Sequence, residues 1–217
     1  MSMLVEEYMV NVSIFFWLSM PESTLKVILS NAGFTLVTTP PPSFSIAPGV
    51  QVTLGPPRRH IASYKSVRIS WDESKFMLNF EGKVKEVVEA LKIVEQSFSK
   101  HGYSLEKVCH YYEVNFAPQP LDINNFIDNL RNKTNLELKI DGEILRPFSI
   151  SLSNVEKPIS REHFYKWLHI IIRPDVNAPQ KRVLVQIVKR DIDFKAMLKF
   201  VESIEEILKQ IKMFFTQ

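Results

Sequence analysis

The sequence predicts an α+β protein built as a tandem duplication, in which two halves share one antiparallel sheet and helices cover one of its faces. Two observations carry this prediction. An order of strand, helix, four strands and helix occurs twice along the chain, and an amphipathic helix closes each copy. We expect the first half at residues 1–104 and the second at 105–217, together forming one domain.

The apolar segment near the N-terminus is predicted to be the first strand. Its aliphatic side chains alternate with polar or aromatic ones, which is the two-residue period of a strand. We expect the aliphatic side chains to face the helices and Phe15 and Trp17 to face the other side. The aliphatic positions are Val10, Val12, Ile14, Phe16 and Leu18.

A helix is predicted next, because Pro21 suits a first helical turn and Leu25, Ile28 and Leu29 have helical spacing up to Gly33. The second copy repeats this order with a strand at 110–116, prolines at 118 and 120, and a helix that carries Ile123, Phe126, Ile127 and Leu130. The four further strands are expected at 34–38, 44–54, 62–71 and 75–80 in the first copy, and at 136–140, 143–152, 164–173 and 183–188 in the second.

Each copy closes with a long helix, at 83–100 and 194–215. Both show apolar positions at i, i+3, i+4 and i+7 opposite a face of Lys and Glu, which predicts a helix lying on a sheet. The C-terminal stripe also approaches a heptad pattern, so coiled-coil pairing is an alternative. A parse as two ferredoxin-like units would need the chain to end on a strand, and it ends on a helix.

This order of elements resembles the fold of the TATA-binding protein family, in which two copies share one curved antiparallel sheet with helices on its convex side. The resemblance covers nearly the whole chain as an order of elements, without a sequence motif. The family inserts phenylalanines between base steps, whereas the corresponding loops here carry Thr39–Pro42 and Asp141–Gly142. The resemblance therefore implies the fold and not TATA-box recognition.

Composition bounds the class of protein. The chain has 217 residues, 45% hydrophobic and 24% charged, with a net charge of +3, which is ordinary for a soluble protein and permits nucleic acid without indicating it. Glu6 and Glu7 precede the apolar segment, and polar residues interrupt it, which argues against a signal peptide and a membrane span. The single cysteine, Cys109, favours a reducing compartment, so we expect a cytoplasmic protein that does not contact membranes.

The residues of common catalytic and metal sites are scattered. His163 and His169 are expected on one strand face roughly 20 Å apart, too far to share an ion. Cys109 and His110 are neighbours on a strand, so their side chains point to opposite faces and form no dyad. The chain has only 6 glycines, none clustered, which excludes a phosphate-binding loop. We expect no metal, no cofactor and no enzyme motif.

Two surface features are candidates for binding. The segment GPPRRH at 55–60 is predicted to be a basic loop whose Arg58 and Arg59 contact phosphate or an acidic partner, or alternatively a solvated connector.

The second candidate is the sheet face turned away from the helices. It is expected to mix aromatic, arginine and amide side chains: Phe15, Trp17, Tyr64, Arg68, Tyr111, Asn115, Tyr165, Trp167, His169, Arg173, Arg182 and Gln186. Such a surface suits a protein interface or a single strand of nucleic acid.

The sequence therefore predicts a binding protein that uses this open face for a protein partner or its own copy. One alternative is a nucleic-acid-binding protein with a preference for single strands. A second is an enzyme built from dispersed residues such as His169, Arg173 and Tyr165. A further alternative is that a second subunit or the proline-rich segment at 40–49 covers the face.

Overall fold

The computed structural model describes residues 8–37, 43–47, 50–53, 58–154 and 163–216. Six α-helices lie in these ranges: α1 (Glu22–Asn31), α2 (Val84–Lys100), α3 (Leu105–Val108), α4 (Phe126–Thr134), α5 (Phe194–Glu202) and α6 (Ile204–Thr216). Two 3-10 turns accompany them, η2 (Glu73–Lys75) and η3 (His163–Tyr165).

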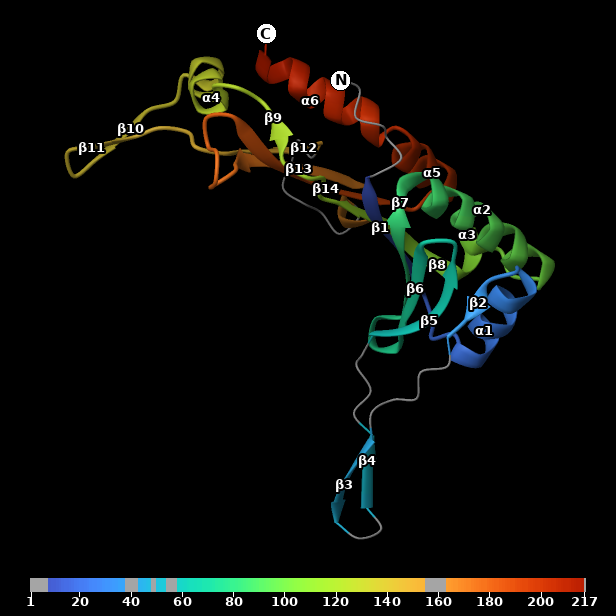
Figure 1. Ribbon diagram of the computed structural model, residues 1–217. Helices are drawn as coiled ribbons and strands as arrows, with labels where there is room; N and C mark the ends of the chain where they lie inside the picture. Colours follow the sequence, from blue (N-terminus) through green and yellow to red (C-terminus); the bar gives the residue numbers. More distant parts are fainter. Residues whose placement is uncertain (1–7, 38–42, 48–49, 54–57, 155–162, 217) are drawn as a thin grey trace.

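The described strands fall into one large sheet and two hairpins (Figure 1). The large sheet holds β1 (Met9–Phe16), β2 (Thr35–Leu36), β5 (Arg58–Tyr64), β6 (Val67–Asp72), β7 (Met77–Lys83), β8 (Cys109–Phe116), β9 (Leu121–Asp122), β12 (Ile150–Ser153), β13 (Trp167–Pro174) and β14 (Arg182–Asp191). The hairpins are β3 (Ser43–Ala47) with β4 (Val50–Thr53), and β10 (Leu138–Ile140) with β11 (Glu143–Leu145).

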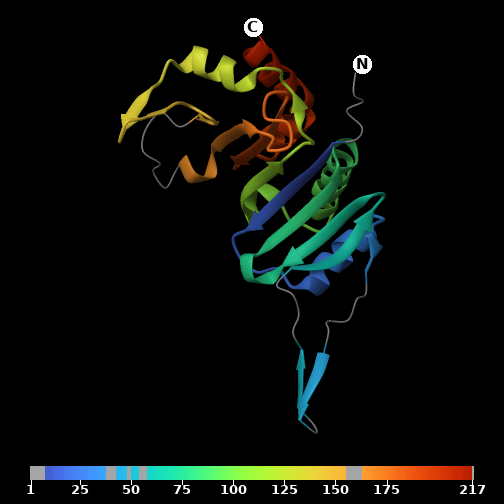
Figure 2. The same cartoon turned by 60° about the vertical axis from the view of Figure 1, so that its left-hand side comes forward.

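The large sheet is antiparallel and open, with β1 and β8 side by side at its middle. From β1 the order runs outward through β7, β6 and β5 to β2, and from β8 through β14 and β13 to β12, while β9 pairs with the far end of β14. In Figure 2 the strands of the first half, drawn in blue to teal, run diagonally side by side. The two halves of the chain are thus joined by backbone hydrogen bonds along the middle of the sheet.

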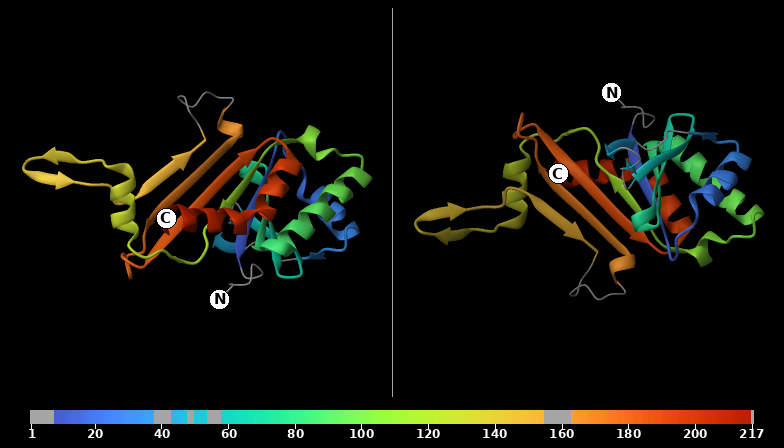
Figure 3. Two further views of the ribbon diagram at one scale, coloured as in Figure 1. Left: turned by 90° about the horizontal axis from the view of Figure 1, so that it is seen from above. Right: turned by 90° about the horizontal axis from the view of Figure 1, so that it is seen from below.

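The helices lie on one face of the sheet (Figure 3), and the side-chain alternation of the strands explains why. Val12 and Ile14 of β1 are fully buried, and their cross-strand neighbours Phe80 and Val114 are also fully buried. The apolar stripes of α2 and α5 cover this side, with Leu91 and Val201 among the fully buried residues. The prediction of an antiparallel sheet with helices on one face is confirmed.

The C-terminal helix was expected to be continuous, and this is wrong. It divides into α5 and α6 at Ser203, whose N–H donates to the carbonyls of both Lys199 and Phe200. The Ser203 hydroxyl also donates to the Phe200 carbonyl, and such local bonds compete with regular helix geometry. At the other end, Asp193 caps α5 by accepting from the N–H groups of Lys195 and Ala196.

Several predicted strands are also wrong in their extent. The expected strand at 62–71 is two strands joined at Lys65, which has a positive φ of 52° and reverses the chain. The expected strands at 44–54 and 143–152 likewise divide, into β3 and β4 and into β11 and β12. The expected strand at 164–173 begins with the turn η3, so His163 does not lie on a strand with His169.

The first strand ends earlier than expected. The register of β1 against β8 shifts between Phe15 and Phe16, after which the Trp17 N–H donates to the Val108 carbonyl at the end of α3. Leu18 lies beyond the strand and is 79% exposed, so its predicted position against the helices is wrong.

Two predicted loops fall wholly or partly outside the described residues. Thr39–Pro42 lies outside them, as does the Gly55–Pro57 part of the expected basic loop. Arg58 and Arg59 are described, and they belong to strand β5 rather than to a loop.

Candidate functional site

The register of the sheet defines which residues lie on the face away from the helices, here called the open face. Ser13 of β1 lies between Asn79 of β7 and Glu113 of β8, one position from the buried Val12. Tyr111 lies opposite Phe15. Since side chains opposite one another in a ladder point to the same side, the other open-face positions follow from the register. They include Met77, Arg68, Asn115, Gln186, Val188, Arg190, Trp167, His169 and Arg173.

Aromatic rings gather at one end of the open face, where β1 ends and β8 begins. The Phe15 and Tyr111 rings stack with centroids 4.3 Å apart, and Trp17 stacks on His110 at 3.9 Å. Tyr165 of η3 lies over this pair of strands, 4.2 Å from the His110 ring and 5.5 Å from that of Tyr111. We call the following set the aromatic cluster: Phe15, Trp17, His110, Tyr111, Phe164, Tyr165 and Trp167.

The cation of Arg190 contacts three rings of the aromatic cluster. The guanidinium of Arg190 on β14 lies 4.2 Å from the centroid of Phe164, 5.5 Å from Trp167 and 5.6 Å from Tyr111. Its Nε donates to Glu113 Oε2 at 2.6 Å, and both side chains are largely buried. The charge of Arg190 is therefore balanced by Glu113 and shared among three rings.

The cluster continues to the edge of the sheet through Trp167 and His169. Their ring centroids are 5.0 Å apart. The Trp167 indole N–H donates to the Ser153 hydroxyl at 2.9 Å, and His169 Nε2 lies 2.5 Å from the Ser151 hydroxyl. Strand β12 thus fixes both rings through hydroxyl contacts.

Burial within the cluster shifts two pKa values. Desolvation lowers the pKa of His110 below its ordinary value, which favours a neutral imidazole. Desolvation raises the pKa of Tyr111, opposed by the positive charge of Arg190. Apart from the balanced pair of Arg190 and Glu113, the centre of the cluster is therefore uncharged at neutral pH.

Of the residues predicted for binding, the structure brings together Trp17, Tyr111, Tyr165, Trp167 and His169. Trp17, Tyr111 and Tyr165 each have a ring contact with another member of the aromatic cluster, while Trp167 contacts Arg190 and His169. Phe164, His110 and Arg190 were not predicted as binding residues. Arg190 could have been found from the two-residue period of β14, because Gln186, Val188 and Arg190 lie on the same face. It lies two residues past the predicted end of the strand.

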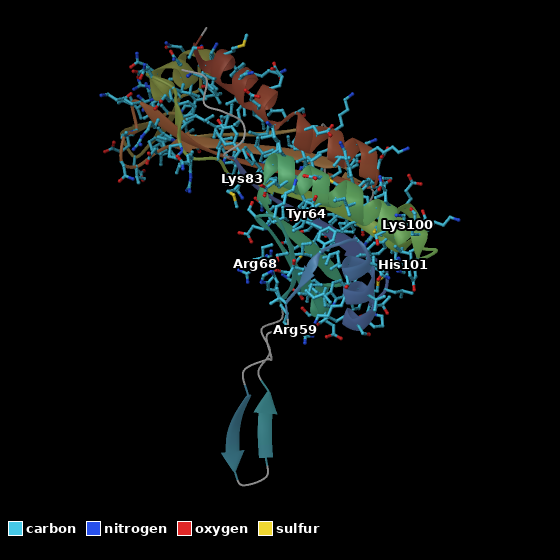
Figure 4. All side chains as sticks on the ribbon, turned by 45° about the vertical axis from the view of Figure 1, so that its right-hand side comes forward. Arg59, Tyr64, Arg68, Lys83, Lys100 and His101 are labelled. Atoms are coloured by element: carbon cyan, nitrogen blue, oxygen red, sulfur yellow. The ribbon has the colours of Figure 1, made fainter. Side chains whose placement is uncertain are left out.

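Tyr64 does not lie on the open face, and its prediction is wrong. Its hydroxyl donates to Glu89 of α2 at 2.7 Å, and its ring packs 5.1 Å from that of Phe34. Figure 4 shows Tyr64 beside α2 and Arg68 on the opposite side of the sheet. The physical cause is the reversal at Lys65, which divides the strand expected at 62–71 and sets Tyr64 opposite Val67, a fully buried residue on the helix side.

The predicted arginines are distributed over separate places. Arg58 forms an ion pair with Glu81 at 3.8 Å, and Arg59 pairs with Glu22 and Glu73. Arg68 lies opposite Glu81, at the far end of β7 from the cluster. Arg173 lines a separate hollow at the other end of β13, together with Pro118 and Gln186.

Tyr165, His169 and Arg173, the residues of the dispersed enzyme alternative, are not gathered into one site. Tyr165 packs on His110, His169 contacts Ser151, and Arg173 is four residues from His169 along one strand, about 13 Å. Within the described ranges no group of three or more His, Cys, Asp or Glu side chains is placed to hold a metal ion. Cys109 is buried on the helix side, and burial raises its pKa to about 12.

A scan against protein-family models gave no match for this chain, and searches of curated proteins and of solved structures gave none either. None of the helices in the described part of the chain is long and apolar enough to cross a membrane.

Proposed function

We propose that this protein is a non-enzymatic binding module whose open face docks a protein partner, with the aromatic cluster as the anchor. The observation that carries the proposal is a set of rings held in one arrangement by mutual stacking and by Arg190, yet partly open to solvent. Trp17 is 57% exposed and Phe164 is 45% exposed. Protein interfaces concentrate their binding energy in such preorganised groups of Trp, Tyr and Arg.

The internal contacts of the cluster favour a protein over nucleic acid. Bases bind on ring faces that are free, whereas Phe15 and Tyr111 cover one another and Trp17 has one face on His110. Arg190 is neutralised by Glu113 and is not free for a phosphate. The cluster therefore offers apolar area with few free charges, as the centre of a protein interface does.

The surroundings of the cluster define the chemistry of the partner. Lys166 and Arg173 lie on either side of Trp167 and His169 on the same segment, and neither forms an ion pair with the described residues. Arg68 is likewise exposed and without an ion pair in the described part of the open face. We propose a protein segment with an apolar or aromatic anchor flanked by carboxylates, because this pattern complements both features.

The test is a titration of the full chain with a fluorescein-labelled peptide that carries Phe and Leu anchors between Glu residues. We expect binding by anisotropy, weakened about tenfold or more by Trp17→Ala. Val27→Ala is the matched control, since Val27 is 55% exposed on α1, on the helix side. Absence of binding, or an equal loss in both variants, contradicts the proposal.

Single-stranded nucleic acid is the second candidate function, favoured by the exposed face of Trp17 and by the unpaired Arg68 and Arg173. A labelled oligothymidylate separates the two. If it binds with an affinity that falls steeply with salt and is lost in an Arg68→Ala, Arg173→Ala double variant, nucleic acid is the better assignment.

We also propose that residues 1–104 and 105–217 arose by duplication. The support is the strand order, since β1, β7, β6 and β5 on one side of the middle correspond to β8, β14, β13 and β12 on the other. Superposing the two sets with α2 on α5 tests this, and a mismatch in strand direction or helix placement contradicts it. A cytoplasmic location stays a prediction, testable by fractionating cells that express the protein.

A further inference from the structure

The two edge strands of the large sheet differ in length. Among the described strands, β2 at one end is only 2 residues long, while β12 at the other has 4 residues, Ile150–Ser153. Ser151, Leu152 and Ser153 are exposed. An edge strand presents unpaired backbone N–H and C=O groups, which proteins usually shield with charges, proline or extreme shortness. β12 contains no charged residue and no proline.

Exposed apolar side chains are concentrated beside this edge. Of the 17 large hydrophobic side chains that are exposed in the described residues, 7 lie between positions 136 and 152. Leu138 and Leu145 are opposite one another in the β10–β11 hairpin and so share one face, and they are 58% and 49% exposed. Phe148, just before β12, is 56% exposed. Figure 3 shows this hairpin projecting on the β12 side of the molecule.

We propose that two copies of this chain associate through their β12 strands, which pair antiparallel about a two-fold axis and join the two sheets into one. Opposite residues of an antiparallel pair point to the same side. Ile150 and Leu152 lie on the helix side, opposite Ile172 and Ile170 of β13, while Ser151 lies on the open side. With the two-fold axis placed at Ser151, Ile150 lies against Leu152 of the partner subunit and Ser151 against Ser151 of the partner subunit.

The composition of the edge favours a second copy as the occupant. At a two-fold axis each side chain meets its own kind, so a charged strand would repel its copy. An uncharged Ile-Ser-Leu-Ser strand does not, and its two aliphatic positions complement one another in the stated register. A ladder of 4 residues is small beside the roughly 1,600 Å² of a standard interface. Phe148 and the apolar hairpin supply further area.

This inference is independent of the proposed function. It concerns the backbone edge of β12, whose Ser153 side chain contacts Trp167 of the aromatic cluster, and it would place two open faces side by side in one dimer.

The test is sedimentation velocity of the full chain from about 1 to about 300 µM, where mass action reveals a reversible dimer. We expect the wild type to dimerise. Ser151→Lys and Ser151→Asp should each raise the dimer dissociation constant about tenfold or more, because like charges meet at the axis. A mixture of the two variants should restore dimers, since opposite charges then meet.

Two controls separate pairing from other causes. Ser151→Ala removes the contact with His169 without adding charge and should keep the dimer. Ser99→Lys adds the same charge at an exposed position of α2 and should also keep it.

A chain that is monomeric at every concentration overturns the proposal, as does a dimer insensitive to Ser151→Lys. Failure of the mixture to restore dimers overturns the register. A dimer lost with Trp17→Ala but kept with Ser151→Lys assigns self-association to the aromatic cluster instead.

Discussion

The open face has two regions that meet along β1, one on the side of β7 and one on the side of β8. They differ in how far their side chains are buried. On the β7 side, Asn79 is 1% exposed although it points away from the helices, and it donates to the Ser13 hydroxyl at 3.0 Å and to the Asn11 side chain. On the β8 side, the neighbouring positions carry Tyr111 and Glu113 with the aromatic cluster around them.

The difference teaches that the polar side chains on the β7 side of the open face are buried and hydrogen-bonded within the protein, while rings on the β8 side remain partly exposed. Ser70 and Asp72 of β6 are also buried on the open side, and Asp72 accepts from the Ser74 hydroxyl and the Lys75 N–H. Polar groups satisfied in this way stabilise the sheet and offer little to a partner. The aromatic cluster stays partly exposed, as the binding surface proposed above requires.

The largest effect on stability should come from Trp71 of β6, which lies on the helix side of the sheet. Trp71 is fully buried on the helix side, 5.9 Å from the Phe16 ring. Trp71→Ala should lower the free energy of unfolding by about 3–5 kcal/mol, because it leaves a large cavity. Urea unfolding measures this. Trp71→Phe is the matched control with a smaller loss, since the indole N–H has no hydrogen-bond partner among the described residues. Equal losses would contradict the cavity explanation.

Asn79→Ala sharpens the comparison directly. It removes the donor to Ser13 and leaves the buried partners of Asn79 unsatisfied, so we expect a loss of about 1–3 kcal/mol in the free energy of unfolding. Peptide binding by the aromatic cluster should be unchanged. An effect on binding larger than on stability would show that the two sides are not separate.

His110 should make stability depend on pH on the β8 side. Because burial lowers its folded pKa, the unfolded chain binds more protons in the interval just below the ordinary value of 6.5. The free energy of unfolding should therefore fall as the pH drops through 6.5, until the folded pKa is passed.

The matched variant for this effect is His110→Phe, which keeps a ring against Trp17 without a titrating group. Between about pH 7.5 and about pH 5.5 the melting temperature of the wild type should fall more than that of the variant. Parallel curves would mean that His110 is not desolvated in the folded protein.

The smallest effect on stability is expected at Trp17. Since it is 57% exposed, Trp17→Ala should change the free energy of unfolding by less than about 1 kcal/mol, while it weakens peptide binding most. Urea unfolding and the binding titration of Trp17→Ala measure the two effects, and the unfolding result is compared with that of Trp71→Ala. A loss as large as that of Trp71→Ala would remove the distinction between core and binding surface.

Much of the fold could be predicted, because it depends on periodicity. The alternation in β1 and the helical spacing of α2 are local patterns that burial imposes, and the structure keeps both. The boundaries of the strands were harder to predict from the sequence. Nothing in the local pattern of residues 62–71 marks the reversal at Lys65, where a non-glycine residue adopts a positive φ.

The candidate site could be predicted only in part, for a related reason. Tyr111 and Trp167 follow from counting along strands, so their side was predictable, whereas Trp17 lies beyond the end of β1 and after its register shift. The prediction for Tyr64 failed because the chain reverses at Lys65, inside the expected strand, and Arg190 was missed because its strand extends beyond the expected end. Contacts between strands distant in sequence, such as Arg190 with Glu113, become visible only through the register.

The pairing of β1 with β8 also has a consequence for how the chain folds. Asn11 pairs with Asn115 on one side and Glu81 on the other, so β1 is completed from two distant segments. During synthesis β7 leaves the ribosome before β8. Until β8 follows, the edge of β1 that pairs with β8 in the finished sheet has no partner strand. Such non-local pairing slows folding and leaves an apolar strand open to aggregation meanwhile. The middle of the finished sheet, its best-protected place, is thus the most vulnerable one in the nascent chain.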